Sequence, residues 1–161
     1  STQGVSSAAS DVYKRQTPLA YLGTAARQIY VVTDRKTPAL TMHRPGVAPV
    51  DGIFEAIIAN TTPWTYLGPY PVRPLPLASF DAGLDVWAPR SLGVARTMNY
   101  WGRMLTGSVA GPNRDLAIVH DTAAVRFTST RPIALQLDGD GLGDVVEAEF
   151  ISVPAAIRVV C

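Results

Sequence analysis

Closely spaced prolines and glycines are the feature that most restricts the fold of this 161-residue chain. Thirteen residues of each type fall in short clusters, which mark turns and divide the sequence into brief apolar runs. Runs this short, separated at regular intervals, favour antiparallel strands over long helices. The pattern suggests a mainly β sandwich or barrel of antiparallel strands, and the fold we expect is a two-layer antiparallel β-sandwich with two short helices. The strands expected in the second half cover residues 116–120, 125–128, 133–137, 145–151 and 157–160.

The first half predicts three further strands. Residues 38–43 lie beside turn signals, and residues 84–88 form a second apolar run. Residues 53–59 are almost continuously apolar, which is typical of a strand covered on both faces. Residues 61–80 contain five prolines, which block both helices and central strands, so this segment is expected to be a long loop.

Helical spacing of apolar residues occurs twice. In residues 17–30 it begins at a Thr-Pro pair, which suits the start of a helix. For the second helix, Ser91 is the expected cap and Gly107 the expected C-terminal stop. The apolar positions that should pack into the core are Leu92, Ala95, Met98, Trp101 and Leu105.

The first sixteen residues differ from the rest of the chain. Residues 1–16 are small, polar and aperiodic, so we treat them as a non-native or disordered leader before a domain at 17–161. Their end resembles an adapter read through at the edge of an assembled gene fragment, and a natural disordered linker is the alternative. Only the first interpretation implies that the true upstream sequence has been cut away.

Composition excludes several classes of function. A net charge of +1 gives nucleic-acid binding no electrostatic support. No apolar run approaches the ~20 residues needed to span a bilayer, so membrane contact is expected to be peripheral. The single cysteine, Cys161, cannot form an internal disulfide, which fits a reducing cytosol. The two histidines, His43 and His120, are isolated and have no partners at metal-ligand spacing.

Two carboxylates stand one residue apart in a glycine-rich turn near the C-terminus. Asp138 and Asp140 follow a strand-like run, and acids in such a turn can hold Mg²⁺ or accept a proton. The spacing approaches that of an EF-hand loop, but Leu142 lacks the oxygen required at position five and the flanks are strand-patterned. Asp-Gly is a strong turn dipeptide, so the segment is expected to be a turn between strands, and the question is whether its carboxylates also do chemistry.

Residues 131–140, Arg-Pro-Ile-Ala-Leu-Gln-Leu-Asp-Gly-Asp, resemble the strand that ends in Asp-Gly-Glu or Asp-Gly-Asp in the diacylglycerol kinase catalytic family. These are bacterial-type lipid kinases related to sphingosine kinases, and the resemblance is to their C-terminal domain in its actinobacterial form. It implies that Asp138 is the general base for a lipid hydroxyl and that Asp140 lies near Mg²⁺ and the phosphates. Asp140 is shorter than the commoner Glu.

Two other motifs carry the same resemblance. Residues 81–86, Asp-Ala-Gly-Leu-Asp-Val, are similar to the family's Asp-Gly-x-Leu-Asp-Val. This similarity implies a metal-network role for Asp81 and a structural role for Asp85, although Ala82 replaces the family's Gly. Asn60 ends a strand as a family Asn does, which implies a cofactor-binding position beside the cleft between the family's two domains.

Trp64 and Tyr66 follow that asparagine in the proline-rich segment. They could line a lipid entrance or fasten the loop to the core, and we favour the second interpretation.

Taken together, the resemblance implies a fragment of an ATP-dependent lipid kinase that transfers the γ-phosphate to a lipid hydroxyl, with diacylglycerol as the default acceptor. The implied cofactors are ATP and Mg²⁺. Family members bind ATP through a Gly-Gly-Asp-Gly loop in an N-terminal domain, and this sequence lacks that loop. We therefore expect ATP to bind through the missing domain and the isolated chain to be inactive. The expected location is cytoplasmic, peripheral to the inner face of the membrane, with a lipid substrate at the membrane surface and no nucleic acid; a homodimer is left open.

Two alternatives remain. Ala82 and the short acid at Asp140 motivate a non-catalytic lipid- or partner-binding β-sandwich that kept the fold and lost the chemistry. A relative acting on NAD or a sphingoid base is a third hypothesis, since a fold does not fix a substrate. The upstream coding sequence separates the first two, because an intact Gly-Gly-Asp-Gly loop favours the enzyme.

Overall fold

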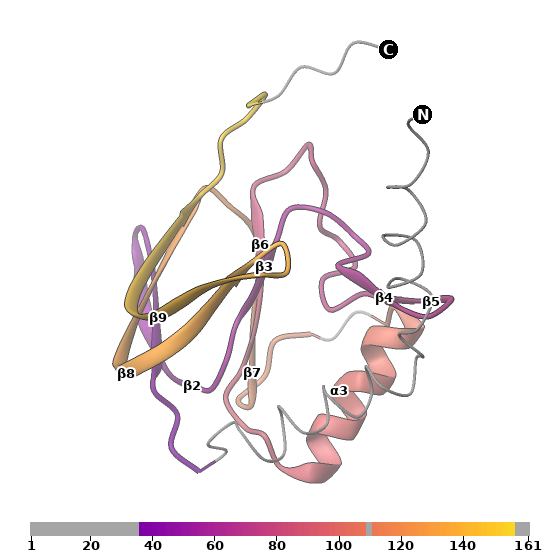
Figure 1. The fold of residues 1–161 in the computed structure, drawn as a ribbon, viewed down its shortest axis with the longest axis horizontal. Coiled ribbons are helices and arrows are strands. Elements are labelled where there is room, and N and C mark those ends of the chain that lie inside the picture. Colours follow the sequence, from indigo (N-terminus) through magenta and orange to yellow (C-terminus); the bar gives the residue numbers. More distant parts are fainter. Residues whose placement is uncertain (1–35, 109–110, 157–161) are drawn as a thin grey trace, which may run out of the picture.

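The computed structural model describes residues 36–108 and 111–156. The leader expected at 1–16, the helix at 17–30 and the strand at 157–160 lie outside these residues. The described part contains nine strands and one helix (Figure 1). In chain order they are β1 (Leu40–Arg44), β2 (Val47–Ile53), β3 (Ile57–Ala59), β4 (Thr65–Leu67), β5 (Tyr70–Val72), β6 (Leu84–Pro89), α3 (Val94–Thr106), β7 (Leu116–Thr122), β8 (Ala124–Leu137) and β9 (Asp140–Ile151).

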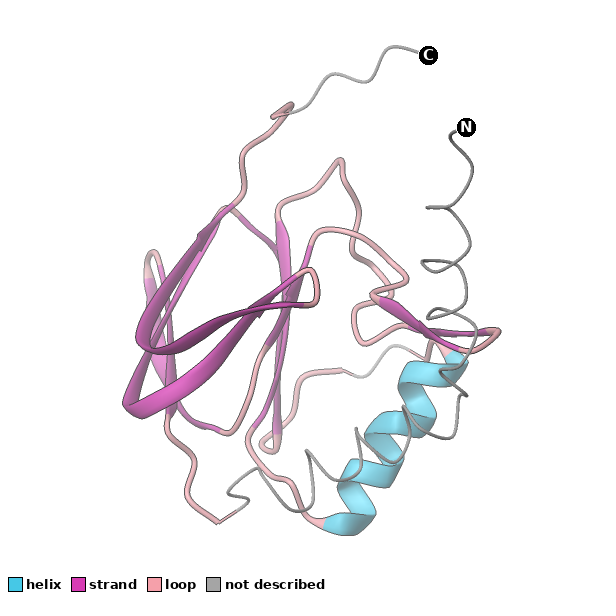
Figure 2. Ribbon diagram, viewed as in Figure 1, coloured by secondary structure: helices cyan, strands magenta, loops and turns pink. Residues whose placement is uncertain are grey.

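The strands form three antiparallel sheets. A four-stranded sheet has the order β2-β1-β8-β9, a three-stranded sheet has the order β3-β6-β7, and β4 pairs with β5. Figure 2 shows the single described helix lying to one side of the strands. The prediction of a mainly β, antiparallel fold is confirmed.

The two larger sheets pack face to face around one hydrophobic core. The four-stranded sheet contributes buried side chains from β1, β2 and β8, and the three-stranded sheet contributes them from β6 and β7. Each fully buried aliphatic side chain stabilises the fold by roughly 1.5–3 kcal/mol relative to exposure. The residues of this core are Met42, Ile53, Val86, Ala88, Val119, Val125 and Phe127.

A second core covers the other face of the three-stranded sheet. Trp87 of β6 meets Tyr100 of α3 edge to face, with ring centroids 5.5 Å apart. Val72, Leu75 and Met104 complete the contact from β5, the following loop and the helix. The helix and the β4–β5 hairpin therefore add a layer to the predicted sandwich, and β6 is buried on both faces.

The strand expected at 53–59 is wrong, because the run is divided between two sheets. β2 ends at Ile53 in the four-stranded sheet, and β3 begins at Ile57 in the three-stranded sheet. The Phe54 N–H donates to Pro89 O (3.0 Å) where the chain crosses between the layers. The crossing places apolar residues in both layers, which produces the same pattern as one strand buried on both faces.

The loop expected at 61–80 contains the β4–β5 hairpin. Pro71 lies in β5 opposite Tyr66 of β4. Both strands of a two-stranded sheet are edge strands, where proline is tolerated because its missing N–H can face away from the partner.

The second predicted helix exists with a different start. It begins at Val94 after Gly93, and Ser91 does not cap it; the Ser91 hydroxyl instead accepts a hydrogen bond from Arg96 (2.7 Å). The predicted stop is confirmed, because Gly107 adopts the left-handed conformation (φ 67°) and its N–H donates to Arg103 O.

The predicted core positions of this segment are partly right: Leu92 is buried and Trp101 packs against the second core. Met98 and Leu105 are instead exposed, and the helix buries Thr97, Tyr100 and Met104. Tyr100 can be buried because its hydroxyl donates to Asp115 O (3.1 Å), which satisfies the polar end of an otherwise apolar side chain.

Candidate functional site

The acidic turn predicted near the C-terminus is a tight β-hairpin. Leu137 of β8 pairs with Asp140 of β9, so Asp138 and Gly139 form a two-residue connection. Both have positive φ, 50° for Asp138 and 94° for Gly139. Two-residue hairpin turns require this backbone conformation, and Asp and Gly are the residues that adopt it at least cost. The predicted turn between strands is therefore confirmed, and the catalytic role of its carboxylates stays a prediction.

The two carboxylates at this tip are open to solvent. All residues from 136 to 144 are exposed. Within the described part of the chain, neither Asp138 nor Asp140 makes a side-chain hydrogen bond or an ion pair. Their oxygen atoms are consequently available to a ligand that approaches the tip.

The register of the three-stranded sheet gathers a second set of polar residues at one end. Ala59 of β3 pairs with Asp85 of β6, and Leu84 of β6 pairs with Thr122 of β7. Asn60 and the turn that contains Asp81 therefore lie at the same end of this sheet. Both side chains are exposed, and the Asp81 N–H donates to Ser79 Oγ (3.2 Å). No hydrogen bond or ion pair among the described residues joins them to the hairpin tip.

Asp85, in β6 at this end of the sheet, has hydrogen-bond partners for its carboxylate. Its side chain is 2% exposed and both carboxylate oxygens lie near His120 Nδ1, at 2.8 and 3.0 Å. The Asp121 N–H also donates to Asp85 Oδ1 (2.9 Å). The sequence showed no Cys or His partner at metal-ligand spacing for His120, and its partner in the fold is Asp85, which the pairing of β6 and β7 places beside it.

This contact changes the protonation of the imidazole. The hydrogen bond to Asp85 raises the pKa of His120 above its ordinary value, partial burial opposes the shift, and the charges of Asp85 and Asp121 add to it. His120 therefore keeps its positive charge to higher pH than a free histidine, opposite a buried carboxylate that needs a partner.

Gly83 explains why the turn before β6 contains a glycine. A Cβ at this position would lie 2.6 Å from Thr122 O and 2.9 Å from the Thr122 carbonyl carbon. The Gly83 N–H donates to Asp121 Oδ1 (2.6 Å), so the close approach also closes a hydrogen bond. Only glycine allows the turn to sit this near to β7.

The described residues contain no group of three or more histidine, cysteine or acidic side chains placed to hold a metal ion. A magnesium ion does not require such a group, because one or two carboxylates and the phosphates of a nucleotide are a common ligand set. The metal role of Asp81 stays a prediction, as do the roles of Asn60, Asp138 and Asp140.

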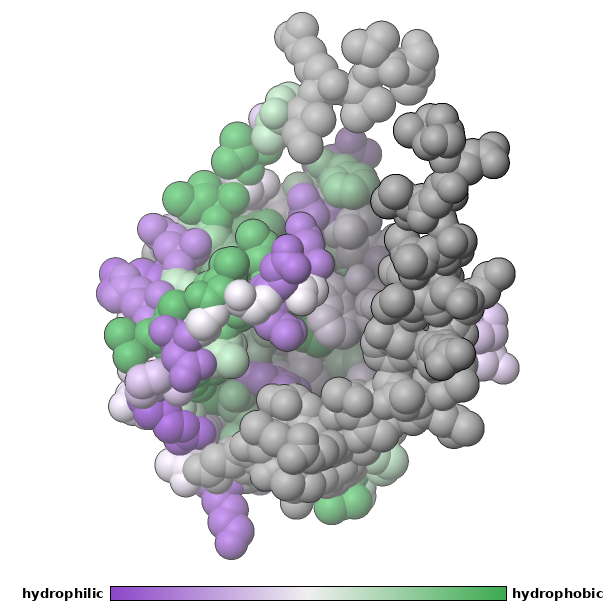
Figure 3. Space-filling model, viewed as in Figure 1, coloured by the Kyte–Doolittle hydropathy of each residue, from purple (hydrophilic) through white to green (hydrophobic). Residues whose placement is uncertain are grey.

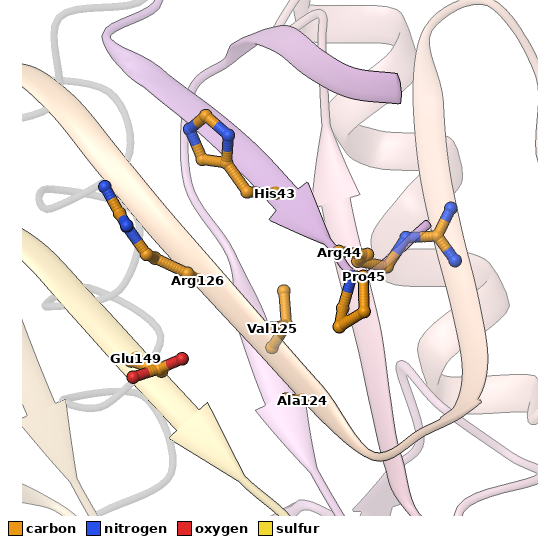
Figure 4. A pocket seen from close by; sticks show the side chains of 7 residues that line it. All are labelled: His43, Arg44, Pro45, Ala124, Val125, Arg126 and Glu149. Carbon is orange, nitrogen blue, oxygen red and sulfur yellow. The ribbon is translucent and has the colours of Figure 1, made fainter. Parts of the chain in front are cut away.

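Two hollows of the surface lie away from the acidic tip. One of about 180 Å³ is lined by residues of β1, β8 and β9, with His43, Arg126 and Glu149 in register across the three strands (Figure 4). A cross-strand row of this kind is typical of a solvated sheet face. A smaller one of about 30 Å³ lies beside Asp85 and His120, under the loop at 74–77.

The β8–β9 hairpin carries exposed apolar side chains among its acids. Leu142, Val146 and Ile151 are all more than half exposed. Figure 3 shows hydrophobic and hydrophilic residues interspersed on this side of the molecule. The mixture leaves no continuous apolar patch visible over the hairpin.

No family model and no curated protein matches the chain. Three solved structures from Bacillus anthracis str. Sterne share its fold. A "putative diacylglycerol kinase" aligns with a TM-score of 0.57 at 18% identity, over 84% of this chain and 48% of that chain. A diacylglycerol kinase aligns with a TM-score of 0.54 at 16% identity and the same coverage. A further "putative diacylglycerol kinase" gives 0.55 and 17%, over 84% of this chain and 46% of that one.

The chain thus spans about half the length of these structures and matches their C-terminal half. At such low identities the likeness establishes a shared fold. The resemblance read from the sequence motifs and the likeness of the structures point to the same group of proteins.

Proposed function

We propose that this chain is the C-terminal domain of an ATP-dependent lipid kinase that transfers the γ-phosphate to a lipid hydroxyl, with diacylglycerol as the acceptor. The observation that carries the proposal is the exposed Asp138–Asp140 pair, displayed without partners at the tip of the β8–β9 hairpin. It stands in a domain whose fold is shared with diacylglycerol kinase structures.

Asp138 is the proposed general base. Phosphoryl transfer depends mainly on positioning and charge neutralisation, so the protein must hold the acceptor hydroxyl and remove its proton. A base does this from about 2.6–3.2 Å, and a carboxylate without competing hydrogen bonds is free to approach that closely. The tight turn fixes the position of Asp138 at the end of a strand, which limits the motion of its backbone.

The other predicted residues serve the nucleotide in this proposal. Asp140 and Asp81 are the carboxylates that would hold Mg²⁺, and Asn60 would contact ATP from the end of β3. Bound Mg²⁺ neutralises the charge of the phosphates. ATP itself would bind through an N-terminal domain, and that domain would also exclude water from the tip.

The proposed location is cytoplasmic, at the inner face of the membrane, with the lipid as the partner. In the described part of the chain, no helix has the length and apolar character needed to cross a bilayer.

A non-catalytic binding domain is the second candidate. It is favoured by the exposed acids of the hairpin tip, which among the described residues belong to no metal-holding group of three or more such side chains and line neither of the two hollows described above.

A lipid phosphorylation assay tests the proposal on the chain rejoined to its native N-terminal half. Asp138→Asn keeps the size and the turn conformation but removes the base, so we expect a loss of about 10²-fold or more in rate. Asp144→Asn, an exposed acid on β9, is the matched control and should retain activity. The isolated chain should be inactive.

Unchanged activity in Asp138→Asn would reduce Asp138 to a turn residue. No activity in the rejoined wild type, across several lipids, would favour the binding domain.

A further inference from the structure

Three large aromatic side chains project into solvent from the β4–β5 hairpin. Trp64 is 46% exposed, Tyr66 63% and Tyr70 65%. The Trp64 N–H donates to Val72 O (3.0 Å), so Trp64 extends the paired strands that carry the other two. Trp64 and Tyr66 were expected to fasten this segment to the core, but Val72 and Leu67 do so instead. The exposed aromatic side chains are therefore accessible to a binding partner.

The hairpin adjoins the C-terminal end of α3 (Figure 1). The Arg73 N–H, just after β5, donates to Met104 O (2.8 Å). The Arg73 side chain lies over the end of the helix, because a Cβ on Gly107 would lie 3.4 Å from Arg73 Cδ. Arg103 stands in the last turn of the same helix, and Leu105 is partly exposed beside it. Aromatic, aliphatic and cationic side chains thus share one end of the molecule.

The two described chain segments that supply these side chains contain no acidic residue. Residues 56–80 and 86–114 include five arginines and neither Asp nor Glu. Arg90 pairs with Asp51 and Arg96 pairs with Asp115. Within the described ranges, the two arginines nearest the hairpin have no acidic partner. They are Arg73 and Arg103.

We propose that the hairpin and the adjoining end of α3, with Trp64, Tyr66, Tyr70, Arg73 and Arg103, form a docking surface for an anionic lipid bilayer. Tryptophan and tyrosine suit the headgroup region, because their rings are apolar and their polar atoms can reach water. Unpaired arginines are attracted to anionic headgroups.

The charge of the surroundings favours the hairpin over the exposed apolar residues of β9. Leu142 and Val146 of β9 are also exposed, but Asp144, Glu147 and Glu149 stand among them. An anionic bilayer would repel that surface and attract the hairpin. An anionic bilayer therefore distinguishes the β4–β5 hairpin from the β9 surface, although both expose apolar side chains.

This surface deepens the proposed function, on which it rests, because a kinase acting on a membrane lipid must be held at the bilayer. Its test uses neither ATP nor catalysis. The 161-residue chain is mixed with vesicles of phosphatidylcholine alone, and with vesicles that also contain phosphatidylglycerol. We expect binding to the mixed vesicles that weakens as salt is added, since screening reduces the attraction of surface charges.

Variants locate the contact. Arg73→Gln and Arg103→Gln should each lower the partition coefficient about fivefold. Tyr66→Ser combined with Tyr70→Ser should lower it at least as much, and brominated acyl chains should quench a fluorescence component that is lost in Trp64→Phe. Val146→Ser is the matched apolar control and should bind like the wild type, with thermal unfolding measured on every variant.

Absence of binding to the mixed vesicles, or equal binding by the hairpin variants, would overturn the proposal. The proposal also fails if the hairpin variants lose self-association, or association with the N-terminal half, while vesicle binding is unchanged. Hairpin-dependent vesicle binding by a rejoined protein without kinase activity would uphold the surface and reject the proposed function. Kinase activity without hairpin-dependent vesicle binding would uphold the proposed function and reject the docking surface.

Discussion

Asp85 in the three-stranded sheet and Asp138 at the tip of the β8–β9 hairpin are held in opposite ways. Asp85 is buried and accepts hydrogen bonds from His120 and from the Asp121 N–H. Asp138 is exposed and has no such partner among the described residues. A carboxylate whose oxygens are already bonded serves the fold, whereas one without partners is available for a substrate.

Burial explains the difference. β6 is covered by the four-stranded sheet on one face and by α3 on the other, so a polar group within it must be hydrogen-bonded or destabilise the domain. The hairpin tip is surrounded by solvent, where an aspartate carries no such penalty. Substitution of Asp85 should therefore lower the free energy of unfolding, whereas substitution of Asp138 should lower the rate of lipid phosphorylation.

The largest expected effect on stability is at Asp85. Asp85→Ala leaves the part-buried Asp121 N–H without its partner and removes a hydrogen bond to a charged group, so we expect a loss of about 2–3 kcal/mol. Urea denaturation measures this loss as a lower midpoint. A change below about 0.5 kcal/mol, the scale of an ordinary surface substitution, would contradict a structural role for this carboxylate.

A substitution at Gly83 tests the packing around the same network. Gly83→Ala forces a methyl group against the backbone of Thr122, and overpacking of this kind costs about 1–3 kcal/mol. Gly102→Ala is the matched control, because the space around that helical position is open and the change should stabilise by roughly 0.5–1 kcal/mol. Equal effects of the two substitutions would show that the contact at Gly83 is unimportant.

The pair formed by Asp85 and His120 predicts a dependence of stability on pH. The folded-state pKa of His120 is raised above the ordinary 6.5, so its contribution is fully present below pH 6.5 and is lost as the pH rises through the folded-state pKa. Thermal unfolding of the wild type and of His120→Gln, compared from about pH 5 upward, measures this contribution. We expect the advantage of the wild type to shrink with rising pH, and a constant difference would contradict the ion pair.

The smallest effect on stability is expected at the hairpin tip. Asp138→Asn and Asp140→Asn should each change the free energy of unfolding by less than about 0.5 kcal/mol, because exposed side chains without partners contribute little. Asparagine also tolerates the positive φ of Asp138. A large loss of stability in either variant would show that the tip carboxylates have structural partners.

Local sequence signals were sufficient to predict the hairpin tip. The features that the sequence analysis missed depend on contacts between residues far apart in the chain. The Asp-Gly dipeptide and the flanking strands were sufficient for the turn at Asp138. The contact between Asp85 and His120 depends on the register of β6 and β7, which are separated by α3, and no local pattern specifies that register. Thr97 and Tyr100 were missed as core residues because each carries a hydroxyl group and was not counted among the apolar positions, although both are buried.

In the proposed function, Asp138 at the hairpin tip serves the chemistry, whereas Asp85 in β6 serves the fold. The most direct measurement compares Asp138→Asn with Asp85→Asn in the rejoined protein, recording both the rate of lipid phosphorylation and the unfolding temperature. We predict that Asp138→Asn loses about 10²-fold or more in rate at an unchanged unfolding temperature, whereas Asp85→Asn unfolds at a lower temperature. Full activity in Asp138→Asn would contradict the proposal that Asp138 is the general base.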